Sequence, residues 1–135
     1  MKIKVDYITN SSSTSFVIIT DDELGREKFY EWFGIDPESD FTYIFSELFD
    51  AVKYNTKLIE DDIEASESLD EYLSTYRLTS EIDRVKEALK AGRKVRVGKL
   101  KSDENGIQTF FCLDSFCIDN ELVYFNALCN VTLSR

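Results

Sequence analysis

Apolar residues near the start of the chain follow the two-residue repeat of a β-strand. Ile3, Val5 and Tyr7 alternate with charged residues, as in a strand with one buried face and one solvent-exposed face. After a polar stretch, residues 16–19 are apolar without alternation, as expected for a strand that is covered on both faces. We therefore predict two N-terminal strands, the second of them in the centre of a sheet.

Helical periodicity dominates the middle of the chain. Thr20 and Glu23 have the spacing of a capping box, which predicts a helix that starts there and ends at Gly34. A second helix is predicted to begin at Asp36 and Pro37, because proline is tolerated in the first turn. The apolar stripe of this second helix is the most regular in the chain and predicts a buried face made of Phe41, Ile44, Phe45, Leu48, Phe49 and Val52.

Two shorter helices are predicted before the chain returns to strands. One begins near Leu69, where Tyr72 and Leu73 follow at helical spacing. The other is capped by Ser80 and ends at Gly92. Its predicted buried side consists of Ile82, Val85 and Leu89.

The last third of the chain shows the alternation of strands. Val95 and Val97 alternate with basic residues, and the turn-forming residues 103–106 separate them from an apolar run at 107–113. This arrangement predicts a hairpin. A final strand is predicted over residues 123–132, in which apolar side chains share one face.

The order of these elements predicts an α+β fold rather than alternating βαβ units. The length favours a single domain that spans residues 1–135. We expect an antiparallel sheet of about five strands, two N-terminal and three C-terminal, with about four helices inserted between them.

Composition restricts the chemistry of the protein more than its fold. The chain is 43% hydrophobic and contains no histidine. The commonest general base, the commonest metal ligand and the usual partner of a catalytic serine or cysteine are therefore absent. An enzyme would have to rely on Ser, Asp, Glu, Lys or Tyr, and no constellation of them is evident. We assign no catalytic, cofactor-binding or metal-binding residue, expect no cofactor, and favour a protein that is not an enzyme.

Several patterns bear on the compartment of the protein. No run approaches the roughly 18 apolar residues of a membrane span, and the first residues lack the apolar core of a signal peptide. The three cysteines fit neither a disulfide framework nor a zinc finger. Four residues separate Cys112 from Cys117, whereas thioredoxin-like redox pairs have two. We expect a cytoplasmic protein with reduced cysteines packed in the core and with no membrane partner.

The net charge of −10 is distributed unevenly along the chain. Residues 21–83 contain 19 acidic and 5 basic residues, while residues 84–101 contain 8 basic residues and 1 acidic residue. Within the acidic part, residues 55–68 have few apolar side chains and lack the ligand spacing and glycine of an EF-hand loop. We interpret them as an exposed, solvated connection. Its acidic group consists of Glu60, Asp61, Asp62, Glu64 and Glu67.

The basic strip suggests a nucleic-acid surface, with two aromatic residues nearby as stacking platforms. The same bases can instead protect an edge strand or neutralise the acidic part of the chain. Because the overall charge is strongly negative, nucleic acid is a disfavoured partner. The residues concerned are Arg93, Lys94, Arg96, Lys99 and Lys101, with Phe110 and Phe111.

A serine-rich segment separates the first two predicted strands. Hydroxyls and successive backbone amides in such a loop can bind a phosphate or a carboxylate. However, no GxGxxG pattern or P-loop lysine accompanies it, and turn-forming serines need no ligand. We interpret the segment as a connecting turn that is also a possible ligand loop. It consists of Asn10, Ser11, Ser12, Ser13, Thr14 and Ser15.

The opening MKIKVDYITNSSSTSFVII resembles that of a group of small bacterial proteins, which begin with a short basic strand followed by TNSSSSSF and an apolar run. Thr14 replaces a serine of that pattern, and Tyr7 and Ile8 stand where phenylalanine and valine are usual. The resemblance covers about 20 of the 135 residues. It implies a bacterial protein and supports the interpretation that the serine segment is more than a turn. No activity is attached to the group, so it assigns no catalytic residue.

Three functional hypotheses follow from the sequence. The first is a non-enzymatic interaction or regulatory module that binds a protein partner or itself through Tyr30, Trp32 and Phe33, because one helix rarely buries aromatic residues on every face. The second is a small-ligand or anion-binding protein built around residues 10–15. The third is an acidic mimic of nucleic acid, in which residues 21–83 occupy a basic partner.

Overall fold

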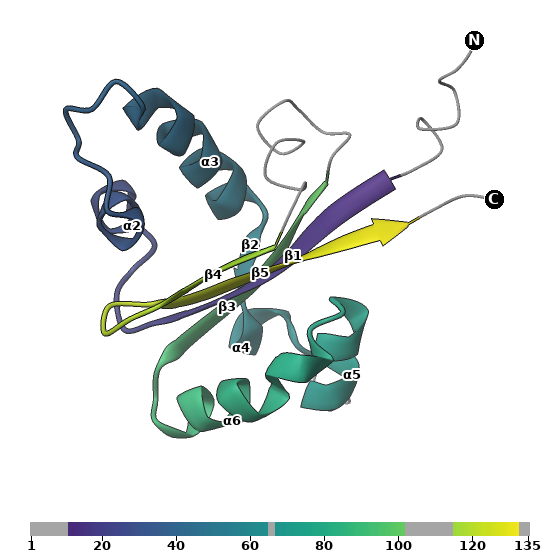
Figure 1. Cartoon of the computed structure of the whole chain (residues 1–135). Coiled ribbons are helices and arrows are strands. Elements are labelled where there is room, and N and C mark those ends of the chain that lie inside the picture. The colour runs from purple at the N-terminus through teal and green to yellow at the C-terminus, as the bar shows by residue number, and fades with distance from the viewer. Residues whose placement is uncertain (1–10, 65–66, 102–114, 133–135) are drawn as a thin grey trace, which may run out of the picture.

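A five-stranded antiparallel sheet forms the centre of the molecule (Figure 1). The computed structural model describes residues 11–64, 67–101 and 115–132. Strand order is β2-β3-β1-β5-β4, so the predicted α+β class with an antiparallel sheet is confirmed. The strands are β1 (Ser11–Thr20), β2 (Thr56–Leu58), β3 (Lys94–Lys101), β4 (Phe116–Asp119) and β5 (Tyr124–Thr132).

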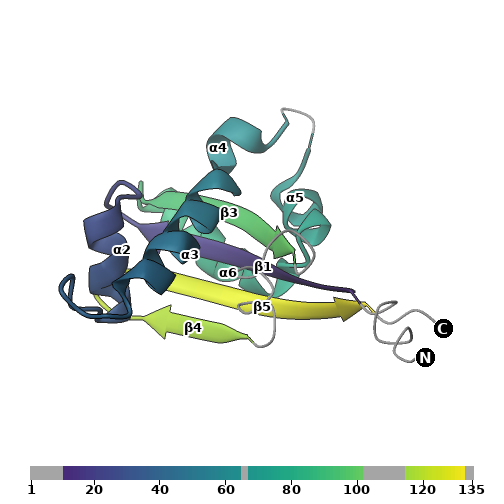
Figure 2. The same ribbon diagram turned by 90° about the horizontal axis from the view of Figure 1, so that it is seen from above.

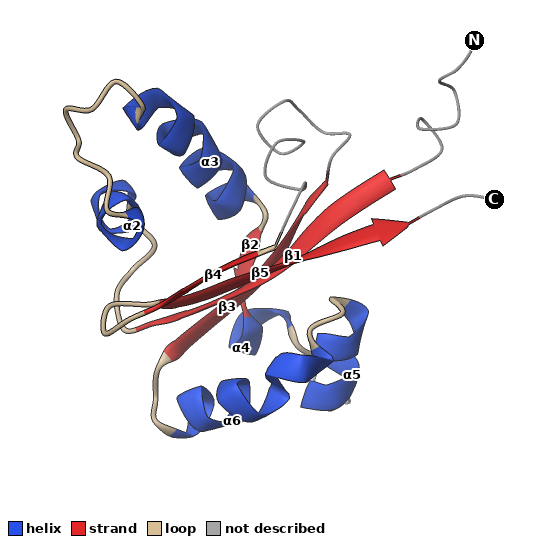
Figure 3. Ribbon diagram, viewed as in Figure 1, coloured by secondary structure: helices blue, strands red, loops and turns tan. Residues whose placement is uncertain are grey.

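Helices cover both faces of this sheet (Figures 2 and 3). α2 (Arg26–Phe33) and α3 (Thr42–Tyr54) pack on one face. The opposite face is covered by α4 (Ile59–Asp62), α5 (Leu69–Thr75) and α6 (Ile82–Lys90), with the 3-10 turn η1 (Thr79–Glu81) leading into α6. Among the described residues, no helix has the length and apolar character needed to cross a bilayer.

Strand β1 lies in the middle of the sheet and separates two hydrophobic cores. Phe16 and Ile18 belong to the core beneath α2 and α3, whereas Val17 and Ile19 belong to the core beneath α5 and α6. All four side chains are at most 1% exposed. The uninterrupted apolar run therefore marks a central strand covered on both faces, as predicted.

The aromatic residues of α2 form the centre of the first core. The Phe29 ring lies 4.9 Å from that of Phe33, 5.3 Å from that of Phe49 and 6.0 Å from that of Trp32, measured between centroids. Tyr30 and Trp32 are 7% and 3% exposed, and Phe33 is half-buried against the same core. The predicted interaction surface of Tyr30, Trp32 and Phe33 is thus wrong: α2 packs against the sheet and against α3, so several of its sides are buried.

Helix α3 confirms most of the predicted apolar stripe. Leu48, Phe49 and Val52 are at most 3% exposed. Phe41, however, is 64% exposed and precedes the helix. The helix begins at Thr42 rather than near Asp36, because residues 36–41 form turns.

The predicted capping by Thr20 is wrong. Its hydroxyl donates a hydrogen bond to the Leu122 carbonyl (2.9 Å) and accepts one from the Asp22 amide (3.3 Å). Helix α2 begins only at Arg26, where no side chain caps it. Its end was predicted correctly, since Gly34 adopts the left-handed conformation with φ of 67°.

A capping box does occur at the start of α5. Ser68 accepts a hydrogen bond from the Glu71 amide (3.1 Å), and the Glu71 carboxylate accepts one from the Ser68 amide (3.0 Å). Ser80, the predicted cap of the following helix, lies within η1 instead, and α6 begins at Ile82.

Strand β2 belongs to the stretch that was predicted to be an exposed connection, so that prediction is wrong for residues 56–62. The strand has three residues and pairs with β3 at the edge of the sheet, and three residues are too few to show a periodic pattern. The predicted strands at residues 3–7 and 107–113 lie outside the described residues. The described sheet therefore has one N-terminal, one middle and three C-terminal strands.

Gly98 allows the junction between α3 and β2 to lie close to the sheet. A Cβ atom at Gly98 would lie 2.4 Å from the Asn55 carbonyl oxygen and 2.4 Å from Cζ of Phe16. Both distances are far below van der Waals contact. A side chain at this position would push the α3–β2 junction away from β3.

Replacing Phe49 by alanine is expected to lower the free energy of unfolding by about 3 to 5 kcal/mol, because it empties a buried aromatic site. Phe41→Ala is the matched control on the same predicted stripe. Because the Phe41 ring is exposed, this variant should change the free energy of unfolding by no more than about 0.5 kcal/mol. Equilibrium urea denaturation measures both values. Equal losses in the two variants would contradict the exposure of Phe41.

Gly98→Ala is expected to lower the free energy of unfolding by about 1 to 3 kcal/mol, the usual range for overpacking a tight site. Gly25→Ala is the control, because a Cβ atom there meets nothing within 4 Å and its φ of −119° suits any residue. Thermal and urea unfolding compare the two. A Gly98→Ala variant as stable as Gly25→Ala would show that the junction moves without cost.

Candidate functional site

The serine segment is not a loop, so its interpretation as a connecting turn is wrong. Residues 11–15 form the first half of β1, where Ser13 pairs with Lys101 of β3 and with Asn130 of β5. An anion-binding nest needs several backbone amides that point to one ligand, whereas strand pairing directs them to the neighbouring strands. Thr14 and Ser15 are at most 1% exposed. Asn10 lies outside the described residues.

Part of the basic strip neutralises acidic residues of the loop between β1 and α2. Arg93 Nε lies 3.1 Å from Asp21, and both Lys94 and Arg96 form ion pairs with Glu23. The hydrogen bond from Lys94, together with its charge, lowers the pKa of Glu23 below its ordinary value. These cations thus serve the neutralising role considered from the sequence, and Phe110 and Phe111 lie outside the described residues.

Asp62 is a structural carboxylate rather than a member of a solvated run. It accepts hydrogen bonds from the hydroxyls of Tyr72 (2.8 Å) and Tyr76 (3.4 Å) and lies 3.4 Å from Lys57 Nζ. The Tyr72 hydrogen bond lowers the pKa of Asp62, and burial raises the pKa of Tyr72. Asp62 therefore ties α4 to α5. No cluster of three or more potential metal-ligating side chains occurs within the described ranges.

The cysteines are placed differently from the prediction of core packing. Cys117 is exposed on β4 and Cys129 is half-buried on β5, while Cys112 lies outside the described residues. Partial desolvation, followed by the charge of Asp119, raises the pKa of the Cys117 thiol. This thiol is therefore protonated at neutral pH, unlike an activated nucleophile.

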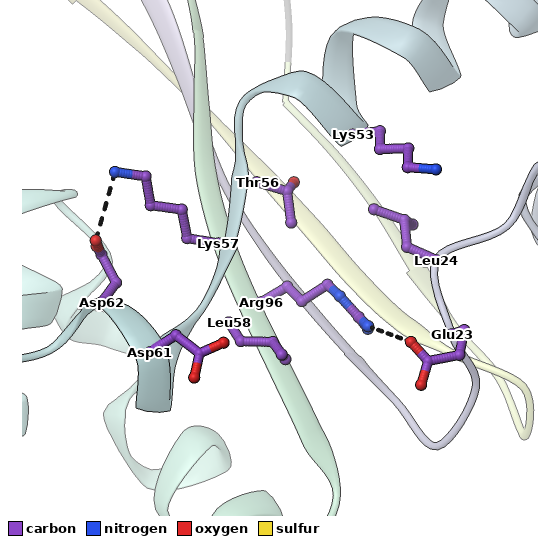
Figure 4. Close-up of a pocket in the computed structure, with 9 residues that line it drawn as sticks. All are labelled: Glu23, Leu24, Lys53, Thr56, Lys57, Leu58, Asp61, Asp62 and Arg96. Carbon is purple, nitrogen blue, oxygen red and sulfur yellow. Dashed lines mark hydrogen bonds and ion pairs between the residues drawn. The ribbon is translucent and has the colours of Figure 1, made fainter.

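An open cavity of about 590 Å³ lies beside the edge strand β2 (Figure 4). The loop after β1 and the end of α3 border it on one side, and α4 borders it on the other. Strand β3 contributes one residue to it. The lining consists of Glu23, Leu24, Lys53, Thr56, Lys57, Leu58, Asp61, Asp62 and Arg96.

Arg96 reaches this cavity because of the register of β3. It pairs with Ile18 of β1 and with Leu58 of β2, and residues paired in this way share one face of the sheet. That face is the one covered by α2 and α3, because Ile18 belongs to their core. The side chain of Arg96 is therefore largely covered and only 7% exposed, although Arg96 belongs to the basic positions that alternate with Val95 and Val97.

The charge of Arg96 is weakly compensated inside the protein. Its guanidinium lies 3.4 Å from the Asp22 carbonyl and 3.4 Å from the Glu23 carboxylate, which are long for charge-assisted hydrogen bonds. The Glu23 side chain is 80% exposed and also pairs with Lys94. Since a buried cation needs a well-placed counter-charge, Arg96 retains capacity for a further anion.

A second buried polar group belongs to Thr56, another residue in the wall of the same cavity. The Thr56 hydroxyl is buried and has no hydrogen-bond partner among the described residues, an arrangement that costs about 1 to 3 kcal/mol. A ligand that accepts a hydrogen bond from this hydroxyl would remove that cost. Nothing in the sequence distinguishes Thr56 in advance, because its burial depends on the three-residue strand β2.

On the opposite face of the sheet, the buried carboxylate of Glu81 has hydrogen-bond partners within the protein. Glu81 is 9% exposed and accepts hydrogen bonds from the Tyr124 hydroxyl (2.5 Å) and the Asn126 amide (3.0 Å). The Arg84 guanidinium lies 4.1 Å from the centre of the Tyr124 ring. Glu81 is thus fixed by short contacts within the chain, whereas Arg96 is not.

No protein-family model, curated protein or solved structure matches this chain.

Asp62→Asn is expected to lower the free energy of unfolding at neutral pH by about 1 to 2 kcal/mol, because Tyr72 loses a charged hydrogen-bond acceptor. The exposed neighbour Asp61 provides the control, and Asp61→Asn should change stability by no more than about 0.5 kcal/mol. Urea unfolding measures both. Equal effects would show that Asp62 is merely a solvated charge.

The same pair of variants gives a pH test. Because folding lowers the pKa of Asp62, the unfolded chain binds its proton more tightly, and the stabilisation disappears as pH falls below the ordinary value of 3.8. The gap in unfolding free energy between the natural protein and Asp62→Asn should therefore narrow below that pH. A gap that stays constant into this acidic range would contradict the assignment.

Proposed function

We propose that this chain is a non-enzymatic protein that binds a small organic anion in the cavity beside β2. The observation that carries the proposal is Arg96, a buried cation whose contacts within the protein are long and which lines an open cavity. Arginine presents a planar set of donors that matches a carboxylate or a phosphate. The proposal keeps the ligand-binding hypothesis from the sequence but moves its site from the serine segment to the sheet edge.

The size of the cavity favours an organic ligand over an inorganic ion. Its volume of about 590 Å³ lies within the range of about 300 to 1,000 Å³ that is usual for small-molecule sites. Leu24 and Leu58 contribute apolar lining between the charged groups. A carboxylate attached to a short hydrocarbon portion would use both kinds of lining.

Binding without catalysis agrees with the side chains around the cavity. The lining contains no cysteine or serine, and its one hydroxyl, that of Thr56, has no hydrogen-bonded base among the described residues. Nucleophilic catalysis requires such a base next to the nucleophile. The absence of histidine from the whole sequence supports the same reading. A bacterial, cytoplasmic setting remains part of the proposal.

The partner-binding hypothesis has lost the observation on which it depended, because the aromatic residues of α2 pack in the core. The exposed aromatic residues are instead Phe41, Tyr43 and Tyr54 within the described part of the chain. Phe41 and Tyr43 lie at the start of α3 and Tyr54 at its end. We therefore place ligand binding first.

Sodium hexanoate at millimolar concentration and constant ionic strength is expected to raise the melting temperature of the protein saturably, as a ligand of the folded state does. Arg96→Gln should abolish this rise. Lys99→Gln is the matched control, because it removes the same charge from the same strand at a position outside the cavity. Circular dichroism establishes that each variant is folded.

Thr56→Val offers a second variant that leaves the charges intact and removes only the buried hydroxyl. It should weaken hexanoate binding, measured by isothermal titration calorimetry, because one hydrogen-bond donor is lost. The proposal fails if hexanoate gives no saturable effect on the natural protein. It also fails if Arg96→Gln and Lys99→Gln respond to hexanoate alike.

A further inference from the structure

The charges that line the cavity are separated into two groups (Figure 4). On one side of the edge strand, Lys53 and Arg96 accompany a single carboxylate, Glu23, which leaves one positive charge in excess. On the other side, Lys57 accompanies the carboxylates of α4, which leaves one negative charge in excess. The nine lining residues are neutral in sum, yet the cavity has a positive and a negative end.

We propose that the ligand is a small organic zwitterion, whose carboxylate binds at the Arg96 end and whose ammonium group binds at the α4 end. This inference rests on the proposed function, because it assumes that Arg96 binds an anionic group. It adds the chemical class of the ligand, because Arg96 alone indicates only that the ligand carries an anionic group.

Lys53 provides the excess positive charge. It lies in the last turn of α3, and its ammonium group is 5.7 Å from the centre of the Phe49 ring. No ion pair joins it to a carboxylate among the described residues. Figure 4 shows Lys53 on the same side of β2 as Arg96. Lys53 and Arg96 are therefore the two cationic donors at this end of the cavity.

Asp61 provides the excess negative charge. Asp62 is turned toward Lys57 and is held by the Tyr72 hydroxyl, so its carboxylate is already occupied. Figure 4 shows the Asp61 carboxylate on the other side of α4, directed toward Leu58 and the cavity. Asp61 has no ion pair with a described residue. It is therefore the carboxylate available to an ammonium group.

The charge arrangement disfavours the simpler ligands. A dianion would place its second charge near Asp61, and a plain amine would approach Lys53 and Arg96. An apolar monoanion would leave Asp61 unused. A zwitterion with a short hydrocarbon spacer satisfies both ends, and its spacer lies against Leu58 and Leu24 between them.

Three probes with the same carbon skeleton test this inference by isothermal titration calorimetry: 6-aminohexanoate, hexanoate and hexylamine. We expect 6-aminohexanoate to bind about threefold to fivefold more tightly than hexanoate, the advantage of one solvent-exposed ion pair. Hexylamine should give no saturable binding. Shorter and longer amino acids, 4-aminobutyrate and 8-aminooctanoate, locate the best separation of the two charges.

Asp61→Asn should bring the affinity for 6-aminohexanoate down to the affinity that the same variant has for hexanoate. Glu60→Gln is the matched control, because it removes an exposed charge from the same helix outside the cavity and should retain the advantage. If 6-aminohexanoate still binds Asp61→Asn more tightly than hexanoate does, the inference is overturned.

The two levels of the proposal fail in different ways. If hexanoate binds through Arg96 but none of the three amino acids binds more tightly, the zwitterion inference is overturned and the proposed function stands. If hexanoate does not bind saturably to the natural protein, the proposed function is overturned and the inference falls with it.

Discussion

Burial of β1 from Thr14 to Thr20 is the constraint on which the rest of this structure depends. Its apolar half, residues 16–19, is at most 1% exposed on both faces, so each face needs its own layer of helices. Its backbone groups need partners on both edges, because buried amides and carbonyls are rarely left unpaired. β3 and β5 supply these partners along the strand. The preceding serines extend the same pairing and become part of the sheet.

The cavity lies at the edge of the sheet formed by β2 and β3, where strand pairing and helix coverage are less extensive than around β1. Within the described ranges, the outer edge of β3 pairs only with the three residues of β2, and Gly98 brings the end of α3 close enough to form that short pairing. Beyond it, Arg96 faces a region that the helices only partly fill. The buried charge on the opposite face, Glu81, has short hydrogen bonds from β5. Arg96 differs from Glu81 because its contacts within the protein are longer.

Patterns that depend on near neighbours in the chain were read correctly from the sequence. The unbroken apolar run of β1, the stripe of α3 from Leu48 to Val52 and the glycine that ends α2 all reflect local periodicity or backbone conformation. Errors occurred where a local motif competed with a distant partner. Thr20 had the spacing of a helix cap, but its hydroxyl bonds to Leu122, 102 residues away.

The sequence by itself determined the class of the fold, because alternating and helical apolar patterns state which faces must be buried. It also excluded chemistry that needs histidine. Only the tertiary structure decided which polar residues meet. Arg96 looked like one member of a basic strip, and Asp61 and Asp62 looked alike, until β2 and α4 set one carboxylate against Tyr72 and left the other beside the cavity. Such differences arise from contacts between distant segments, which periodicity does not encode.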